Sequence, residues 1–224
     1  MAQSFSLAPE YEYIEDDMYR TQQNESEFGY VQTFSMWPYP KRRFSLHWNA
    51  AFDTEMWSIR SFFRDHRGPA SQFDYIPMDP IATPHQAGSA SEIAGGALGS
   101  RTYYYAISWV TAQGETTISP VASFAVASSK LFKLTIPTFW YRNITKARVY
   151  VGTSAGATKL EAEVTTSAGS WTEPTSGLVG TGATPPTTNT AKETVSVHLV
   201  DDTLSIRKVS PVSYTIDLAF EELF

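Results

Sequence analysis

The sequence predicts a mainly β protein with one flanking helix, in which a second β-rich module is inserted into the first. Short runs that alternate apolar and polar residues, the pattern of strands with one buried face, recur along the chain. Residues 44–48 (FSLHW) and 214–220 (YTIDLAF) are clear examples. Residues 53–67 instead place apolar side chains at helical spacing.

The length and net charge of the chain limit its number of domains and exclude some classes of function. The chain has 224 residues, of which 42% are hydrophobic, and a formal net charge of −6. This length is sufficient for one large domain or two modest ones, each with its own core. The sequence contains no basic stripe that would neutralise phosphates, so we expect no nucleic-acid binding, sequence-specific or otherwise.

Cysteine is absent from the sequence, which excludes disulfides and thiolate metal sites. No apolar run approaches the ~20 residues that span a bilayer, so we expect no membrane insertion. The first residues, MAQSFSLAPEYEY, lack the basic and apolar regions of a secretory signal. We therefore expect a soluble product that stays inside the cell or joins a particle assembled there.

An acidic segment near the N-terminus is followed by two predicted strands, residues 27–37 and 42–50, and then by the helix. Asp53 or Thr54 is placed to cap this helix, and Glu55 complements the N-terminal end of its dipole. One face of the helix is apolar and is predicted to meet the core: Met56, Ile59, Phe62 and Phe63.

The C-terminal end of the helix accounts for the stretch FFRDHRGP, residues 62–69. Positive charge is favoured in a last helical turn, and we expect the basic residues there to face water: Arg64, His66 and Arg67. Gly68 is placed for the left-handed conformation that ends many helices, and Pro69 prevents continuation.

Two stretches rich in small residues, 86–97 and 180–192, are predicted as linkers. Between them, residues 98–190 contain short alternating runs separated by Gly, Pro and Ser, which is typical of an all-β sandwich. In the first of these runs one face is predicted to carry the large side chains: Tyr103, Tyr105, Ile107 and Trp109.

The strands after the second linker cannot bury their apolar face alone. We therefore expect them to return to the sheet of the N-terminal part, so that residues 1–90 and 192–224 form one discontinuous domain. Residues 98–190 would then be an inserted module.

A possible nucleophile motif occurs at residues 152–156, where GTSAG matches the G-x-S-x-G pattern of hydrolases around Ser154. That chemistry needs a strand before the serine and a helix after it. The residues that follow alternate like another strand, so a hairpin turn explains the glycines better.

Other potential catalytic groups have simpler explanations. Adjacent carboxylates in a strand point to opposite faces, and we assign Asp201–Asp202 to a turn and Glu221–Glu222 to a solvated tail. The histidines are far apart and lack metal-ligand spacing: His47, His66, His85 and His198. We therefore expect no catalytic residue, no metal and no cofactor, and a protein that is not an enzyme.

One binding feature remains. The segment PTFWYRN presents Phe139, Trp140 and Tyr141 consecutively, so at least one ring faces outward if the segment is extended. Exposed aromatic rings stack on sugars or contact partner proteins. These three residues form a possible recognition surface, with core packing or a wide loop as the alternative.

The stretch from FSMWPYPKRRFSLHWNA through EMWSIRSFFRDHRG to SQFDYIPMDP resembles the N-terminal part of phage distal-tail and minor-tail-tip proteins. The ending VDDTLSIRKVSPVSYTIDLAFEEL resembles the closing strands of the same family, and together these parts, residues 34–80 and 200–223, cover about a third of the chain. The positions that match the family pattern are Trp37, Arg42, Arg43, Phe62, Phe63, Arg67, Gly68, Phe73, Asp79 and Pro80.

The middle module resembles the immunoglobulin-like or fibronectin type III-like domains that are often inserted in phage tail proteins. TYYYAISWVTAQGETTISP and ARVYVGTSAG are the segments that carry this likeness. A minimal ring protein of the family lacks such an insertion, so an additional role at the host surface is an open question here.

The resemblance implies a structural virion protein at the tail tip, assembled in the host cytoplasm. Its core would be a tube-like β-sandwich with a flanking helix, and six copies would close a ring around the DNA channel. Its partners would be the tail tube protein and the tail hub or tip proteins, in a baseplate or similar assembly. The immunoglobulin-like module would project outward as a decoration with weak affinity for a host-surface glycan.

Two alternatives come from other classes. A carbohydrate-binding host-surface adhesin of the tail would place its aromatic side chains in an exposed patch of the middle module. A hydrolase would require Ser154 to be reactive.

Overall fold

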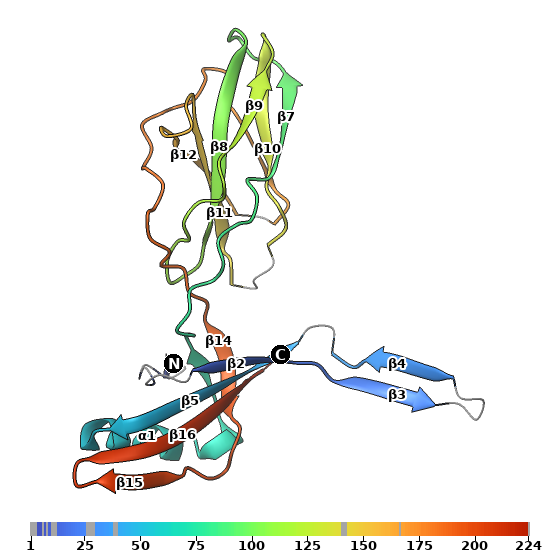
Figure 1. The fold of residues 1–224 in the computed structure, drawn as a ribbon. Helices are drawn as coiled ribbons and strands as arrows, with labels where there is room; N and C mark the ends of the chain where they lie inside the picture. The colour runs from blue at the N-terminus through green and yellow to red at the C-terminus, as the bar shows by residue number, and fades with distance from the viewer. Residues whose placement is uncertain are drawn as a thin grey trace. The chain divides into compact units, whose positions relative to one another are not determined.

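The computed structural model describes residues 4–5, 7, 9, 13–25, 30–37, 40–139, 143–165 and 167–223. The chain divides into two compact units: unit 1 comprises Met1–Ile76 and Val195–Phe224, and unit 2 comprises Pro77–Thr194 (Figure 1). The predicted fold class is confirmed, since the protein is mainly β, with one α-helix in the described residues and a β-sandwich inserted into a discontinuous core.

Unit 1 is built on a seven-stranded sheet with the order β1-β6-β14-β16-β5-β2. Strand β15 pairs with the first half of β16, on the same side as β14, which pairs with the last residues of β16. The β1–β6 pair is parallel and all other pairs are antiparallel. The strands are β1 (Ser4–Phe5), β2 (Ile14–Met18), β5 (Lys41–Ala51), β6 (Gln72–Tyr75), β14 (Val195–Leu199), β15 (Ile206–Ser210) and β16 (Ser213–Glu222). Strands from both ends of the chain therefore share one sheet.

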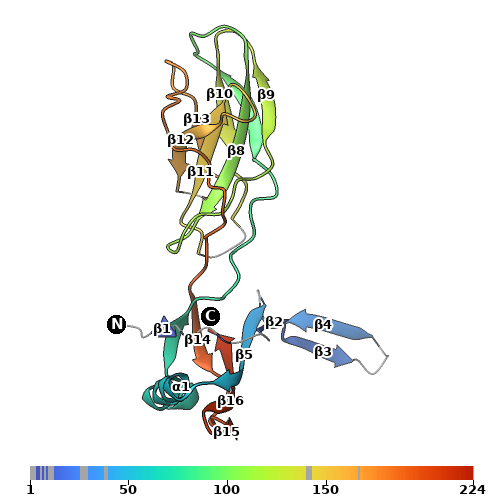
Figure 2. The same ribbon diagram turned by 60° about the vertical axis from the view of Figure 1, so that its left-hand side comes forward.

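Helix α1 (Asp53–Asp65) packs on one face of this sheet, which we call the inner face (Figure 2). The alternation predicted for β5 is confirmed, because Phe44, Leu46 and Trp48 are all buried. The core between helix and sheet adds further apolar side chains: Phe5, Met56, Ile59, Phe73, Tyr75, Val195, Val197, Leu199, Ile216, Leu218 and Phe220. Phe62 and Phe63 are half-buried and pack against this cluster, as the helical spacing predicts.

The start of α1 differs from the prediction by one residue. Its N-cap is Phe52, and the backbone N–H of Phe52 donates to the Glu55 carboxylate at 2.9 Å. Asp53 is already the first helical residue, where its negative charge complements the helix dipole. The acceptor that satisfies this helix end is thus Glu55 rather than Asp53 or Thr54.

At the end of α1 one expectation needs correction, for His66, and the left-handed conformation expected at Gly68 is confirmed. His66 does not face water: it is 5% exposed, its ring lies 4.1 Å from that of Phe62 and 5.0 Å from that of Phe73, and its Nδ1 donates to the Phe62 carbonyl oxygen at 2.9 Å. The left-handed conformation begins one residue early, at Arg67 (φ 53°), and continues at Gly68 (φ 65°). Gly68 also opens a 3-10 turn, η1 (Gly68–Ala70).

Strands β3 (Thr21–Glu25) and β4 (Val31–Ser35) form a separate two-stranded hairpin that follows β2. In the part of unit 1 that the structure describes, they pair only with each other. Every residue of both strands is exposed. The predicted strand at residues 27–37 corresponds to β4, and its alternating apolar residues do not face a core within this chain.

Unit 2 is a sandwich of two antiparallel sheets with the orders β12-β11-β8-β9 and β13-β10-β7. Its strands are β7 (Ser89–Ala94), β8 (Arg101–Val110), β9 (Ala122–Val126), β10 (Lys130–Thr135), β11 (Lys146–Gly152), β12 (Lys159–Val164) and β13 (Ser170–Thr172). The predicted face of β8 is confirmed, since its four large side chains are buried between the sheets: Tyr103, Tyr105, Ile107 and Trp109.

The predicted linkers need correction, because both belong to unit 2. Residues 86–97 contain β7, which pairs with β10 along its whole length. Residues 180–192 follow the sandwich surface, where the N–H of Leu160 donates to the Ala183 carbonyl and the N–H of Ile81 donates to the buried Ala191. These backbone bonds and burial explain why small residues here are ordered parts of a domain.

The insertion point lies at the end of one antiparallel strand pair. Tyr75, the last residue of β6, is directly opposite Val195, the first residue of β14. Paired residues in antiparallel strands have Cα atoms about 5 Å apart. The whole of unit 2 therefore stands where a hairpin turn would otherwise connect β6 to β14.

Candidate functional site

The seven-stranded sheet of unit 1 presents three features beyond its core: an ion-pair cluster at one end of the inner face, a polar outer face, and edge strands of opposite charge. Each is built from residues of strands that are far apart in sequence. In the described residues we find no group of side chains with the geometry of a metal site, and no helix long and apolar enough to cross a membrane.

The ion-pair cluster is centred on Arg42 in β5. Its Nε donates to the Glu222 carboxylate at 3.1 Å, its backbone N–H donates to the same carboxylate at 3.3 Å, and its Nη1 donates to Glu15 at 3.4 Å. The guanidinium also lies over the Phe44 ring, 5.6 Å from its centroid. Arg42 thus connects β2, β5 and β16 at the end of the core.

Glu222 is a residue that sequence reasoning assigned wrongly. We expected Glu221–Glu222 in a solvated tail, but Glu222 is 5% exposed and occupies the inner-face position that follows Phe220 in the alternation of β16. The period-two pattern of this strand contained the signal, because residue 222 has the same parity as Ile216 and Leu218. Arg42 supplies the counter-charge that makes a buried carboxylate tolerable.

The outer face carries a row of polar side chains across five strands. In register, Asp16 (β2) is opposite Arg43 (β5), Arg43 is opposite Glu221 (β16), and Glu221 is opposite His198 (β14). Gln72 of β6 completes the row. The charges of Asp16, Arg43 and Glu221 alternate in sign along the row. The Nζ atom of Lys41 lies 3.7 Å from the Glu221 carboxylate. The row stabilises the pairing of strands that come from both ends of the chain.

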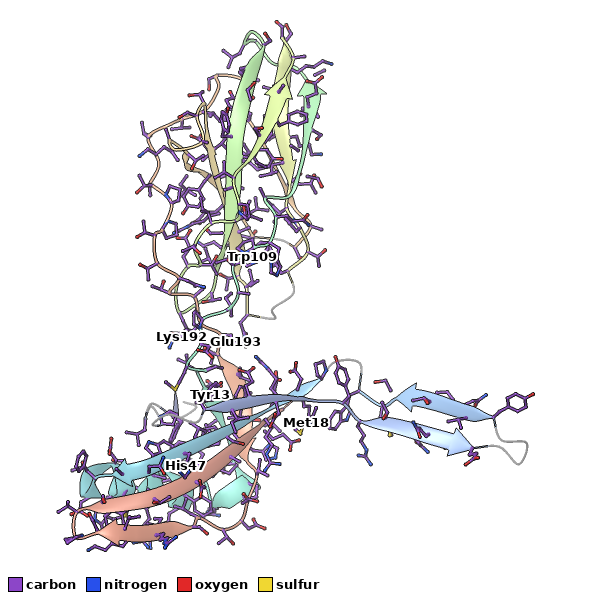
Figure 3. The ribbon with its side chains drawn as sticks, in the orientation of Figure 1. Tyr13, Met18, His47, Trp109, Lys192 and Glu193 are labelled. Atoms are coloured by element: carbon purple, nitrogen blue, oxygen red, sulfur yellow. The ribbon has the colours of Figure 1, made fainter. Side chains whose placement is uncertain are left out.

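A shallow hollow of about 300 Å³ lies on the same face around His47, which sits midway along β5 (Figure 3). The Nδ1 of His47 forms a hydrogen bond with the Asp217 carboxylate, and its Nε2 lies 2.8 Å from Asn49 Oδ1. Ser45 also lines the hollow. Because both ring nitrogens already have partners, His47 is not positioned to act as a base toward Ser45 as in a serine hydrolase.

Among the described strands, β2, β15 and the two-residue β1 lie at edges of the sheet, and β2 and β15 have opposite charge. Strand β2, at one edge, reads Ile-Glu-Asp-Asp-Met, and its three acidic residues are exposed. Strand β15, at another edge, reads Ile-Arg-Lys-Val-Ser, and its Arg207 and Lys208 are exposed. In Figure 1 these strands border unit 1 on opposite sides, with β5 and β16 between them.

The residues that match the tail-family pattern do not form one site. Phe62 and Phe73 meet in the core with their ring centroids 4.8 Å apart, Phe63 packs beside them, and Arg67 and Gly68 form the helix end. Arg42 and Arg43 neighbour each other in β5 but point to opposite faces. Trp37 is half-buried under the ammonium group of Lys41, and Asp79 and Pro80 are exposed at the start of unit 2.

The possible recognition surface is only partly described. Phe139 packs against the core of unit 2, with its ring 5.0 Å from that of Trp109, while Trp140 and Tyr141 lie outside the described residues. A cavity of about 550 Å³ opens beside Trp109 and is also lined by Pro84, His85 and Pro137. Ser154 occupies an exposed hairpin turn between β11 and β12, as expected from the glycines.

Two buried glutamates of unit 2, Glu173 and Glu193, were not identified by sequence analysis, and Glu173 is the more deeply buried. Glu173 accepts hydrogen bonds from Arg101 Nη2 at 2.6 Å, from the Phe132 backbone N–H at 2.9 Å and from the Tyr103 hydroxyl. The cluster joins β8 of one sheet to β10 of the other. Burial, and then the bond to Glu173, raises the pKa of Tyr103 to about 12. These contacts are structural, since they close one end of the sandwich.

Comparison with known proteins adds no assignment: no protein-family model matches the chain, and a search of curated proteins found no match.

Proposed function

We propose that this chain is a structural virion protein of a tailed phage, a distal-tail or tail-tip component that connects the tail tube to the tip or baseplate. In this proposal unit 1 forms a homo-oligomeric ring, with six copies as the expected number, and contacts the tail tube and hub proteins. Unit 2 is an immunoglobulin-like decoration. The protein has no catalytic role and is assembled into the virion in the host cytoplasm.

The β3–β4 hairpin carries the proposal. Every residue of both strands is exposed, and the apolar side chains of β4 include Val31 (56% exposed) and Phe34 (52%); Met36 (51%) follows directly after β4. An isolated two-stranded hairpin is marginally stable in water. A hairpin of this kind is best explained as part of a larger assembly, in which another subunit covers it.

The distribution of the tail-like segments gives further support. The segments that resemble the tail family lie in sequence on both sides of unit 2, and most of their residues belong to unit 1. The part that resembles an inserted immunoglobulin-like domain is unit 2, a two-sheet sandwich. The resemblance and the division into units therefore separate the chain at similar places.

The native mass of the purified chain, measured over a range of concentrations together with negative-stain images, tests the proposal. A closed ring of about six subunits with a central opening is the expected result. A chain that stays monomeric at every concentration, and also when mixed with a tail tube protein of the same phage, would contradict it.

A second candidate, a carbohydrate-binding adhesin of the tail, is favoured by the cavity beside Trp109. Its volume of about 550 Å³ is in the range of small-ligand sites. Its walls combine Trp109 and two prolines with the polar side chains of His85 and Gln86, a mixture that suits a sugar ring. Glycan-array binding of the full chain tests it, and binding that Trp109→Ala leaves unchanged would exclude this cavity.

A further inference from the structure

We infer that strand β2 of one copy adds to strand β15 of a second copy, which continues the unit 1 sheet from subunit to subunit. This inference rests on the proposed function, because it specifies how the subunits of the proposed ring contact each other. Both strands are edges of the same sheet, and both are five residues long. Unpaired backbone groups along a sheet edge are a template for another strand.

The charges of the edges determine which pairs can form. Edge β2 carries three exposed acidic residues, and edge β15 carries two exposed basic residues. Two β2 edges repel each other, and so do two β15 edges, whereas β2 against β15 is attractive. Pairing of unlike surfaces is heterologous, and such contacts close into rings or extend as filaments rather than forming two-fold dimers.

The direction of the strands follows from the sheet. Strand β2 is antiparallel to β5, β5 is antiparallel to β16, and β16 is antiparallel to β15. Strands β2 and β15 therefore run in opposite directions within one copy. If copies follow one another with the same face outward, β2 and β15 meet as an antiparallel pair, which matches the rest of the sheet.

The register follows from the two faces. Asp16 lies on the outer face opposite Arg43, and Arg207 lies on the outer face opposite Thr215. Glu15 and Lys208 lie on the inner face, opposite Phe44 and Tyr214 respectively. Facing residues in a pair point to the same side of a sheet. A register with Asp16 opposite Arg207 keeps every side chain on its own face.

The same register also brings compatible side chains together at the neighbouring positions of the two strands. Asp16 opposite Arg207 places Glu15 opposite Lys208, which gives one pair of opposite charges on each face. It further places Ile14 (49% exposed) close to Val209 (59% exposed), which lies at the irregularity between Lys208 and Ser210 of β15. A shift of one residue would put side chains that face each other on different sides of the sheet.

A five-residue strand pair buries less than a stable interface of about 1,000 Å² requires. The β3–β4 hairpin supplies the remainder, because β3 begins at Thr21, shortly after β2 ends at Met18. A neighbour that pairs with β2 is within reach of this hairpin and of its exposed Val31 and Phe34. The pairing thus covers the apolar side chains that unit 1 leaves exposed.

Site-directed crosslinking tests the register directly, because the chain contains no cysteine. Two single variants, Asp16→Cys and Arg207→Cys, are purified, mixed and oxidised. We expect a dimer that contains one chain of each kind. The matched control mixes Asp16→Cys with Lys208→Cys, which places the thiols on opposite faces, and its dimer yield should be several-fold lower. Equal yields from the two mixtures at high protein concentration would overturn the inference.

A charge exchange gives an independent readout. Asp16→Arg and Arg207→Asp should each weaken self-association. An equimolar mixture of these two variants should recover it and form rings in which the variants alternate, because each edge of one variant is then opposite in charge to the facing edge of the other. The exposed variant Asp53→Arg, at the helix start, serves as a control for net charge. Rings that assemble normally from Asp16→Arg would refute the β2–β15 contact and leave the proposed function intact. Absence of rings in the wild-type chain, both alone and when mixed with a tail tube protein of the same phage, would count against the proposed function itself.

Discussion

Arg42 and Glu222 are 180 residues apart in the sequence, yet the Arg42 guanidinium and backbone N–H both donate to the Glu222 carboxylate. This contact fastens the last long strand of the chain to the first long strand of unit 1. The same guanidinium also donates to the Glu15 carboxylate, so Arg42 contacts two carboxylates.

Glu222→Ala is therefore expected to destabilise unit 1 by about 2–3 kcal/mol, because it leaves the largely buried charge of Arg42 without its main partner. Chemical denaturation of the full chain measures the loss. Glu221→Ala is the matched control: its carboxylate lies on the outer face, 3.7 Å from Lys41, and its removal should cost less than about 1 kcal/mol. Equal losses in the two variants would contradict the role of Arg42.

Unit 2 should lose stability in alkaline solution. The pKa of Tyr103 is raised to about 12 from its ordinary value of 10.0, so the folded state favours the neutral phenol. This contribution is fully present below pH 10, because Tyr103 of the unfolded chain ionises only near its ordinary pKa. It is lost as the pH rises toward 12. The midpoint temperature of thermal unfolding, measured from pH 9 to about 12, should fall less steeply with pH for Tyr103→Phe than for the wild type. Tyr104→Phe, on the other face of β8, should follow the wild type.

The helix end offers a pair of substitutions with opposite expected effects. Arg67 has a φ of 53°, a region that Asn tolerates better than Arg, so Arg67→Asn should stabilise unit 1 by about 0.5 kcal/mol. Gly68 has a φ of 65°, and a methyl group there would meet Asp202 only at ordinary contact distance. Gly68→Ala should therefore cost about 1 kcal/mol from backbone strain alone. Urea midpoints that move in the same direction would contradict this account.

Unit 1 should fold without unit 2. Because Tyr75 and Val195 are already paired, a deletion of residues 76–194 with an Asn-Gly turn in their place would join β6 to β14 as a hairpin. We expect this variant to be soluble and to unfold cooperatively, with a circular dichroism spectrum of mixed strand and helix. A spectrum typical of an unfolded chain would show that unit 1 depends on the inserted module.

Sequence periodicity was sufficient for the elements that bury one face. Phe44, Leu46 and Trp48 alternate so regularly that their strand, and the need for a helix or sheet to cover it, could be predicted. The same reasoning found the buried face of β8. Return of the C-terminal strands to the N-terminal sheet followed from the area they would otherwise expose.

Elements without such a pattern were missed for identifiable reasons. Strand β7 reads Ser-Ala-Ser-Glu-Ile-Ala and its order comes from hydrogen bonds to β10, a partner that composition does not reveal. The inner-face position of Glu222 was hidden by its charge, and only a distant arginine makes that burial favourable. The opposite charges of β2 and β15 were visible in the sequence, but their place at opposite edges of one sheet required the topology.

The position of unit 2 between two paired residues also bears on how the chain folds. Closing a disordered loop of this length between β6 and β14 costs about 4 kcal/mol in chain entropy. A folded unit 2 removes most of that cost in advance, because its first and last segments are already joined where Ile81 donates to Ala191. The folded inserted module then holds the ends of β6 and β14 close together before they pair. Substitutions that slow the folding of unit 2 should therefore delay formation of the unit 1 sheet.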